Sequence, residues 1–417
     1  MTAPAPTKSK KHVVVVGGGG AGSMFARRLS RALDASQHEL TVINARPFNI
    51  YLPSTPRMAV TAEDNFEDKV LVPFDRLLAK GVGQVKIGRV VGVEPADGAG
   101  KGGDGKAGGR GGEVVLEDGE RVRYDALVLA PGMRWSGPLD FPDSKDGTLA
   151  HIREWRNKFA KADKIVMAGG GPVNIGKSAS QLAGELKYYF PNKSVTIVQS
   201  GDLPLNKVYA PRFRRAVDVR IRARGVELVF GEYLDETAPK DGVVTTRSGR
   251  KIPADLVVSS TGGTPATDFL SNIVPSILTP SGRVRTEPTL QVTSHPDIFC
   301  IGDVVETEER PSLGKYKKHS QVVCANVLAR LRDDPAKAVY KGSIESIGIT
   351  MGKTGGAGYL GILWGLVSPN WLIWLAKART LGTRAARFHM GYGIMDSLRG
   401  TPLSESVALN ATATAAA

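Results

Sequence analysis

Apolar segments that end in glycine recur along the chain, and the first of them lies close to the N-terminus. Residues 12–16, HVVVV, form an uninterrupted apolar run, which is typical of a strand buried in a parallel sheet. Residues 23–35 follow with a helical pattern, and residues 39–45, ELTVINA, return to a strand pattern. This order predicts a strand–helix–strand unit.

The same order begins again in the middle of the chain. Residues 163–171, DKIVMAGGG, and residues 193–202, KSVTIVQSGD, each predict a strand that ends in a turn. Strand patterns continue through residues 225–263, and a buried strand within residues 296–306, PDIFCIGDVVE, precedes a predicted helix over residues 320–331. The chain is therefore predicted to be an α/β protein with two Rossmann-like units.

The turn after the first strand has the glycine spacing G-x-G-x-x-G. Gly17 permits the tight turn, Gly19 lets the backbone approach a pyrophosphate, and Gly22 lets the helix and the strand pack closely. The N-terminus of the helix then offers unpaired N–H groups to phosphate oxygens. Because the loop stands between a predicted strand and a predicted helix, it predicts a dinucleotide site rather than a glycine-rich turn without a ligand.

Three further segments bear on the same site. The second strand ends at Asn44, where an acid usually accepts hydrogen bonds from ribose; an amide oxygen can accept one bond, but without charge assistance. The strand ending at Gly302 and Asp303 delivers a carboxylate to the sheet edge where α/β proteins bind ligands, and we expect Asp303 to accept from the ribityl chain of a flavin. Residues 124–133 and 254–263 end in small-residue turns, which are either close to a cofactor or ordinary strand–turn junctions.

The order and spacing of these segments resemble those of the pyridine-nucleotide-dependent FAD oxidoreductases. Within them, the chain is most similar to the apoptosis-inducing-factor-like proteins of the ferroptosis suppressor protein type, which are related to type II NADH dehydrogenases. The resemblance covers residues 12–393 and is carried by YLPSTPRMAV (51–60), HSQVVCANV (319–327), MGKTGGAGYLG (351–361) and WLAKARTL (374–381).

The resemblance implies two Rossmann-like, three-layer domains of the glutathione-reductase type and a short C-terminal segment. The expected organisation is a disordered N-terminus (1–11), an FAD-binding domain (12–150 and 257–337, with a glycine-rich insertion at 97–112), an NAD(P)H-binding domain (151–256), a membrane-facing C-terminal segment that holds a quinone site (338–400) and a disordered tail (401–417).

The resemblance also implies the cofactors, FAD with NADH or NADPH, and the residues that bind them. Around FAD these residues are Gly17, Gly19, Gly20, Ala21, Gly22, Asn44, Arg57, Val90, Ala130, Gly132 and Asp303. The second loop and its surroundings add Gly169, Gly171, Pro172, Asn174, Gln199 and Gly262.

Two residues fall on family positions that imply a catalytic role. His319 falls on a histidine at the expected start of a helix whose positive N-terminus would point at the flavin. The alternative for His319 is a residue that caps its own helix. Lys377 falls on a lysine of the C-terminal segment, and the alternative is a basic residue beside an apolar surface.

The second glycine loop, GGGPVNIGKSASQLAGEL, departs from the family pattern. Asn174 replaces the third glycine, and the glutamate expected soon after it aligns with Gly176 or Gln181, depending on where an insertion is placed. Asparagine caps helices well, so the loop either binds the nicotinamide cofactor in an altered way, which we favour, or has lost this binding. The next strand ends in TIVQS without an acid that would repel a 2′-phosphate, so NADH and NADPH both remain candidates.

The C-terminal segment has the composition of a membrane interface. Residues 359–376 carry no charge and are followed by Lys377, Arg379 and further arginines up to residue 387, while Pro369 interrupts the apolar run and disfavours a spanning helix. Tryptophans beside cations are typical of interfacial segments, so residues 359–387 predict peripheral membrane contact. The alternative is a pair of short elements packed on the flavin domain.

The net charge and the cysteines bear on the partners, the metal content and the compartment of the protein. The net charge of +14 fits an anionic partner, a phosphorylated cofactor or acidic lipid, or a basic surface kept for solubility. We find no nucleic-acid recognition motif and predict no nucleic-acid partner. Cys300 and Cys324 offer neither a metal-ligand spacing nor a redox pair, which predicts no metal site and a reducing, intracellular compartment.

We therefore predict an NAD(P)H:quinone oxidoreductase of the non-disulfide type, cytoplasmic with peripheral attachment to a membrane such as the mitochondrial surface or a lipid droplet. Its oligomeric state is open. Two alternatives remain: a soluble NAD(P)H reductase of a small electron carrier, and an apoptosis-inducing-factor-like FAD-binding protein with weak or no turnover. Asn44 and the altered second loop favour the last alternative.

Overall fold

The computed structural model describes most of the 417-residue chain. The described ranges are 9–79, 82–96, 110–169, 175–259, 262–273, 277–309, 312–362 and 365–400. The predicted disordered tail, most of the predicted N-terminal extension, residues 97–109 of the glycine-rich insertion and residues 170–174 of the second loop lie outside them. Lys11, expected in a disordered N-terminus, already belongs to the first strand and pairs with His38.

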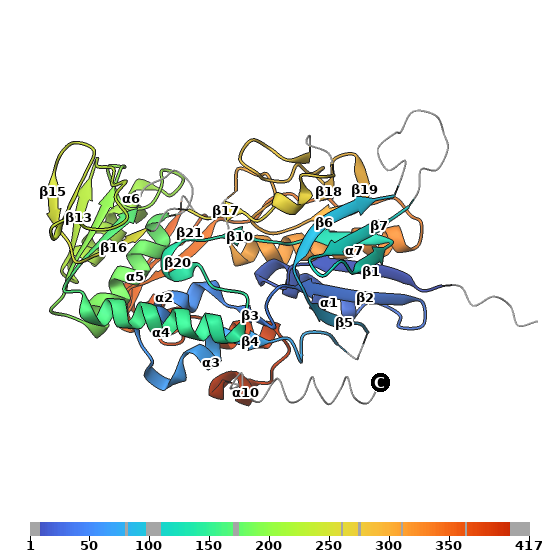
Figure 1. Ribbon diagram of the computed structural model, residues 1–417, viewed down its shortest axis with the longest axis horizontal. Helices are drawn as coiled ribbons and strands as arrows, with labels where there is room; N and C mark the ends of the chain where they lie inside the picture. The colour runs from blue at the N-terminus through green and yellow to red at the C-terminus, as the bar shows by residue number, and fades with distance from the viewer. Residues whose placement is uncertain are drawn as a thin grey trace, which may run out of the picture.

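The first sheet has six strands in the order β18-β19-β9-β1-β2-β5 (Figure 1). Its strands are β1 (Lys11–Val16), β2 (His38–Asn44), β5 (Gln84–Ile87), β9 (Ala126–Leu129), β18 (Gln291–Val292) and β19 (His295–Cys300). All neighbours pair in parallel except β18 and β19. The apolar run of β1 is buried in a core to which two helices and a second, antiparallel sheet contribute. The helices are α1 (Gly20–Ser30) and α7 (Leu313–Leu331), and the antiparallel sheet consists of β6 (Val90–Pro95), β7 (Gly112–Leu116) and β8 (Arg121–Tyr124).

The second sheet is a parallel sheet in the order β13-β12-β11-β16, at the opposite end of the molecule in Figure 1. Its strands are β11 (Lys164–Gly169), β12 (Ser194–Gln199), β13 (Val226–Phe230) and β16 (Leu256–Ser259). Helices α4 (Lys145–Lys161), α5 (Ile175–Tyr189) and α6 (Pro211–Arg222) share its core, and β14 (Val243–Thr245) pairs with β15 (Lys251–Pro253) beside it. The predicted α/β class with two Rossmann-like units is confirmed.

The C-terminal segment contacts both units. Its antiparallel sheet of β20 (Ser346–Thr350), β21 (Gly356–Leu360) and β22 (Leu366–Ser368) packs on α6, and α9 (Thr383–His389) and α10 (Ile394–Arg399) pack on α3 (Glu67–Val70) of the first unit. Between them lie α8 (Asn370–Ile373) and a π-helical turn, η6 (Trp374–Ala378). Among the described residues, no helix combines the length and the apolar character that crossing a bilayer requires.

Helix α7 begins earlier than the sequence predicted. The expected start was near His319, but the helix starts at Leu313, where the Ser312 hydroxyl accepts a hydrogen bond from the Lys315 N–H (3.2 Å). This N-cap satisfies one of the unpaired N–H groups of the first turn and stabilises the extra turns despite Gly314. His319 therefore lies inside the helix and is not a capping residue.

Candidate functional site

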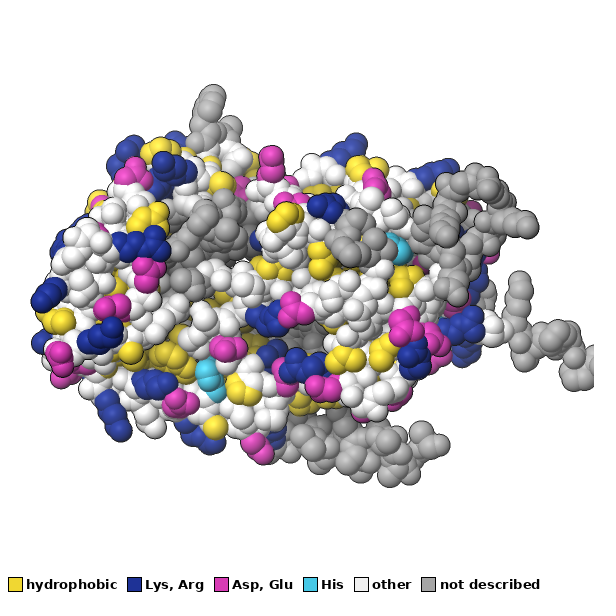
Figure 2. Space-filling model, turned by 45° about the horizontal axis from the view of Figure 1, so that its top comes forward, with side chains coloured by type: hydrophobic (Ala, Val, Ile, Leu, Met, Phe, Trp, Pro, Cys, Tyr) yellow, Lys and Arg dark blue, Asp and Glu magenta, His cyan; other side chains and the backbone are white. Residues whose placement is uncertain are grey.

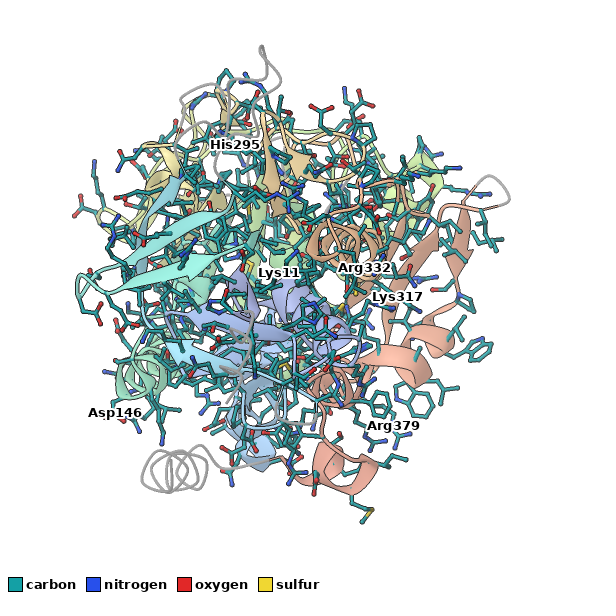
Figure 3. The ribbon with its side chains drawn as sticks, turned by 90° about the vertical axis from the view of Figure 1, so that its right-hand side faces the viewer. Lys11, Asp146, His295, Lys317, Arg332 and Arg379 are labelled. Atoms are coloured by element: carbon teal, nitrogen blue, oxygen red, sulfur yellow. The ribbon has the colours of Figure 1, made fainter. Side chains whose placement is uncertain are left out.

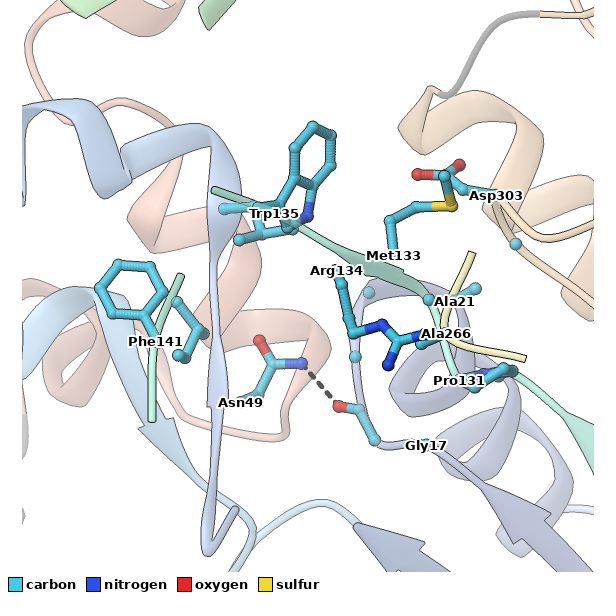
Figure 4. Close-up of a pocket in the computed structure, with 18 of the residues that line it drawn as sticks. Gly17, Ala21, Asn49, Pro131, Met133, Arg134, Trp135, Phe141, Ala266 and Asp303 are labelled. Atoms are coloured by element: carbon cyan, nitrogen blue, oxygen red, sulfur yellow. Dashed lines mark hydrogen bonds between the residues drawn. The ribbon is translucent and has the colours of Figure 1, made fainter. Parts of the chain in front are cut away.

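A cavity of about 740 Å³ lies at the carboxyl ends of the strands of the first sheet (Figure 4). This volume is within the range of small-molecule and cofactor sites. One side is formed by the glycine loop and by Gly302–Asp303, and the other side receives Gln181, Leu205 and Tyr209 from the second unit. The cavity is therefore lined by both Rossmann-like units.

The glycines of the first loop differ in what surrounds them: Gly17 and Gly22 are packed against backbone, whereas Gly19 faces open space. Gly17 has φ +101°, and a Cβ there would lie 2.1 Å from the Ala130 carbonyl oxygen. A Cβ on Gly22 would lie 1.8 Å from the carbonyl oxygen of Gly17, so both glycines are required for close packing. Gly19, in contrast, has no protein atom within 4 Å of such a Cβ, and it lines the cavity.

Two asparagines hold the loop through the peptide groups of Gly18. The Asn44 side-chain oxygen accepts from the Gly18 N–H at 2.8 Å, and the Asn49 amide donates to the Gly18 carbonyl at 2.6 Å (Figure 4). The Asn44 amide also donates to the Arg46 carbonyl at 2.7 Å. Sequence reasoning missed Asn49, whose signal was a polar residue inside the short strand β3 (Phe48–Ile50). In this structure the amides support the shape of the loop.

Asp303 faces the cavity and is held by α7. Its carboxylate accepts a hydrogen bond from the hydroxyl of Tyr316 at 2.7 Å, and both residues line the cavity. Burial, followed by the negative charge of Asp303, raises the pKa of Tyr316 well above its ordinary value, so the phenol stays protonated and donates. Trp135 also lines the cavity, and its indole N–H is buried without a hydrogen-bond partner among the described residues. These groups fit a polyhydroxylated ligand that can accept and donate hydrogen bonds.

His319 lies behind this wall of the cavity. It is fully buried, its Nδ1 accepts from the Gly302 N–H at 3.2 Å, and its ring meets the Tyr340 ring edge-on at 4.4 Å between centroids. Burial, and secondly the nearby Lys315 ammonium, lower the pKa of His319 to about 3. Because the side chain does not belong to the described lining of the cavity, its position is that of a support for the Gly302 turn.

The lowered pKa of His319 predicts that this residue makes the folded protein less stable as the pH falls. The unfolded chain protonates this histidine below about pH 6.5, whereas the folded protein does not until about pH 3, so stability is lost as the pH falls between these values. We expect His319→Asn, which can keep an acceptor for Gly302, to lose about 1 kcal/mol less unfolding free energy than the wild type between pH 7.5 and 5.5. Denaturant titrations at both pH values measure this difference, and equal losses in the two proteins would contradict it.

The side chains of Arg57 and Lys377 form contacts outside the described lining of the cavity. The Arg57 guanidinium forms a buried ion pair with Glu185 of α5, with the Nε to Oε2 distance at 2.8 Å. The Lys377 ammonium donates to the carbonyl of Gly348 in the C-terminal sheet. Neither side chain is part of the described lining.

The second loop is described only at its edges. Gly169 ends β11 and pairs in register with Gln199 of β12, whose amide donates to the carbonyls of Leu203 (3.3 Å) and Leu205 (3.2 Å). Predicted residues Gly171, Pro172 and Asn174 lie outside the described residues. Gln181, one of the two positions to which the expected glutamate aligned, lines the cavity and donates to the Pro53 carbonyl at 2.8 Å.

The structure thus brings together a subset of the predicted residues. Those that line the cavity are Gly17, Gly19, Gly20, Ala21, Asn44, Val90, Ala130, Gly132 and Asp303. Those that are described but lie outside its lining are Gly22, Arg57, Gly169, Gln199, Gly262, His319 and Lys377.

Comparison with known proteins agrees with this geometry. The family model for pyridine nucleotide-disulphide oxidoreductases matches residues 11–325. The FAD-dependent oxidoreductase FVFD30 of Flammulina velutipes is 39% identical over 334 residues, which are 80% of this chain and 99% of that protein. Ferroptosis suppressor protein 1 of Taeniopygia guttata is 24% identical over 387 residues, covering 88% of this chain and 93% of that protein.

A solved structure extends the likeness to the whole fold. The sulfide:quinone oxidoreductase of Aquifex aeolicus superposes with a TM-score of 0.68 at 18% identity, covering 95% of this chain and 94% of that chain. The predicted family resemblance and the predicted cofactors, FAD and NAD(P)H, are confirmed at the level of the family. The match over most of the chain, together with a glycine loop that opens into a cavity between two Rossmann-like units, establishes that this protein belongs to the pyridine nucleotide-disulphide oxidoreductases.

Proposed function

We propose that the protein transfers electrons from NAD(P)H through FAD to a quinone at a membrane surface. The observation that carries this proposal is the cavity lined by both units, because a flavin held by the first unit would meet a nicotinamide held by the second unit there. A quinone as acceptor is further supported by the sulfide:quinone oxidoreductase of the same fold, which is named for such an acceptor.

The residues of the chain bind and orient the cofactor. Bound FAD would supply the redox chemistry: it would accept a hydride from NAD(P)H, giving NAD(P)⁺, and return two electrons, which with two protons would reduce a quinone to a quinol. The open backbone at Gly19 and the first N–H groups of α1 would hold the pyrophosphate, with Asn44 and Asn49 fixing the loop behind it. Asp303 would accept from a ribityl hydroxyl.

A dithiol relay does not fit this chain. Its two cysteines are Cys300 on β19 and Cys324 on α7, and both are buried and free. Burial raises the pKa of each thiol, which disfavours the thiolate needed for disulfide exchange. This favours the direct route from flavin to acceptor.

The membrane surface is proposed from the C-terminal segment. Trp371, Leu375 and Phe388 are 62%, 58% and 63% exposed, and Arg379 lies over the Trp374 ring at 5.5 Å. Figure 3 places Arg379 at the edge of the molecule beside ring side chains of the C-terminal elements. Among the described residues on the face drawn in Figure 2, Lys and Arg are interspersed with Asp and Glu. We therefore propose peripheral attachment through residues 359–387, on a cytoplasmic surface such as that of mitochondria or lipid droplets.

This attachment can be tested on vesicles. We expect Trp371→Ser/Leu375→Ser to weaken binding to phosphatidylcholine–phosphatidylglycerol vesicles about tenfold or more, because each side chain loses about 1–2 kcal/mol of apolar transfer. Val219→Ser is the matched control, since Val219 is an exposed apolar residue (65%) on α6. Equal cosedimentation of all three proteins would exclude this surface.

The proposed reaction is tested by an anaerobic visible spectrum. We expect the flavin absorbance to bleach on addition of NADH or NADPH and to recover on addition of a short-chain quinone. A flavin that stays oxidised with both donors would leave an FAD-binding protein without turnover. Quinone turnover that is unaffected by lipid, together with faster reduction of a small carrier, would instead support a soluble reductase.

A further inference from the structure

A fully buried ion pair joins the two Rossmann-like units next to the cavity. The Nε and Nη2 atoms of Arg57 donate to the two carboxylate oxygens of Glu185 at 2.8 and 3.0 Å. The two side chains are 1% and 0% exposed. Arg57 lies on α2 (Thr55–Val60) of the first unit and Glu185 lies on α5 of the second. A bidentate pair of this kind fixes orientation as well as distance.

Both partners lie directly behind the wall of the cavity. Thr55 and Pro56, the residues before Arg57, line it. Gln181 lines it from α5 and stands one helical turn before Glu185, on the same face of the helix. A displacement of α5 would therefore move Gln181 and the part of the cavity wall that it forms.

The C-terminal segment completes the contacts of Arg57. Its Nη2 donates to the Ala378 carbonyl at 2.8 Å and its Nη1 to the Arg379 carbonyl at 3.1 Å. Burial raises the pKa of Glu185, and the hydrogen bonds from Arg57 oppose this rise. The guanidinium of Arg57, on the first unit, therefore contacts both the second unit, through Glu185, and the C-terminal segment.

We propose that Arg57 and Glu185 are a positioning pair that sets the placement of the nicotinamide relative to the flavin. The inference rests on the proposed function, because it concerns the alignment of its two cofactors. A buried ion pair is a weak source of stability, since replacement by apolar residues of similar volume is often neutral or stabilising. Alignment, in contrast, is sensitive: a misplacement of about 1 Å can slow a reaction about 100-fold.

The test uses the FAD-loaded, full-length protein in anaerobic stopped flow. We expect Arg57→Met/Glu185→Leu to keep its FAD content and to lower the limiting rate of flavin reduction by NADH about 10- to 100-fold, with the apparent Kd for NADH changed less than about threefold. Arg57→Lys keeps the positive charge but cannot donate to both carboxylate oxygens in the planar geometry of a guanidinium. We expect this variant to lower the limiting rate of flavin reduction about threefold to tenfold. The matched control is Arg156→Met/Glu67→Leu. Arg156 also holds Glu67 with two nitrogens (2.7 and 3.2 Å) and donates to the Met58 carbonyl of the same helix α2, but neither Arg156 nor Glu67 belongs to α5 or to the described lining of the cavity.

Different results would overturn the positioning role of the pair and the proposed function. A folded, yellow double variant that is reduced within twofold of the wild-type rate would overturn the proposal, and so would loss of FAD, which would mean that Arg57 acts on the flavin site itself. If neither NADH nor NADPH reduces the wild type, the proposed function fails, and the pair is judged by X-ray solution scattering. There we expect a larger radius of gyration for the double variant than for the wild type and the control, and identical profiles would overturn the role of the pair.

Discussion

Replacing Gly22 with alanine should leave the protein almost free of FAD and lower its free energy of unfolding by about 3 kcal/mol. The added Cβ would lie 1.8 Å from the carbonyl oxygen of Gly17 and 3.2 Å from the Cβ of Ala130. These neighbours cannot yield cheaply, because one is backbone and the Gly17 N–H is already bonded to the Ile43 carbonyl at 2.8 Å. The loop must therefore move away from the sheet, at a cost typical of an overpacked core. The absorbance ratio at 450 and 280 nm and the thermal midpoint measure both effects.

The matched control is the same substitution three residues earlier. Gly19→Ala adds a methyl group that meets no protein atom within 4 Å, so we expect the thermal midpoint of the FAD-free protein to stay within about 2 °C of the wild type. The methyl group would occupy the open side of the loop and weaken FAD binding. A Gly22→Ala protein as yellow and as stable as the wild type would refute the packing argument.

Replacing Asp303 with alanine should weaken FAD binding by about 10- to 100-fold, because a hydrogen bond to a charged group contributes about 1.5–3 kcal/mol. Asp303 lines the cavity at the carboxyl end of β19, and Tyr316 orients its carboxylate. Fluorescence titration of the FAD-free protein with FAD measures the Kd.

The Tyr316→Phe variant tests whether FAD binding needs only the carboxylate of Asp303 or also its orientation by Tyr316. This variant keeps the carboxylate of Asp303 and removes only its hydrogen-bond donor. We expect it to weaken FAD binding less than Asp303→Ala does. If the Asp303→Ala protein binds FAD as tightly as the wild type, Asp303 does not contact the cofactor.

Local patterns in the sequence predicted the strands and one glycine loop. The run HVVVV is a buried parallel strand because its neighbours on both sides are strands, and the spacing of Gly17, Gly19 and Gly22 follows from three different packing requirements within a few residues. Asp303 was also found from a local pattern, since it stands three positions after the end of a buried strand. Whether these residues bind FAD stays a prediction.

Contacts between distant segments could not be predicted in this way. Arg57 and Glu185 are separated by 128 positions, and neither helix carries a local signal for the other. His319 is buried inside α7, where its ring contacts Tyr340 and where burial and the Lys315 ammonium lower its pKa; the helix is capped at Ser312 and starts ahead of the expected place. The role of a polar residue thus depended on tertiary packing that composition and spacing do not encode.

The order of strands in the first sheet has a consequence for synthesis on the ribosome. Strand β9 ends at Leu129, but its neighbour β19 begins at His295, after the entire second sheet has been made. At ordinary translation rates of 5–20 residues per second, the nascent chain carries an open, apolar edge at β9 for roughly 10–30 s. The second sheet, whose strands all lie between Lys164 and Ser259, is complete earlier. Edge-to-edge aggregation during expression is therefore expected to start from the first unit, and a chaperone that covers β9 would protect it until β19 has been synthesised.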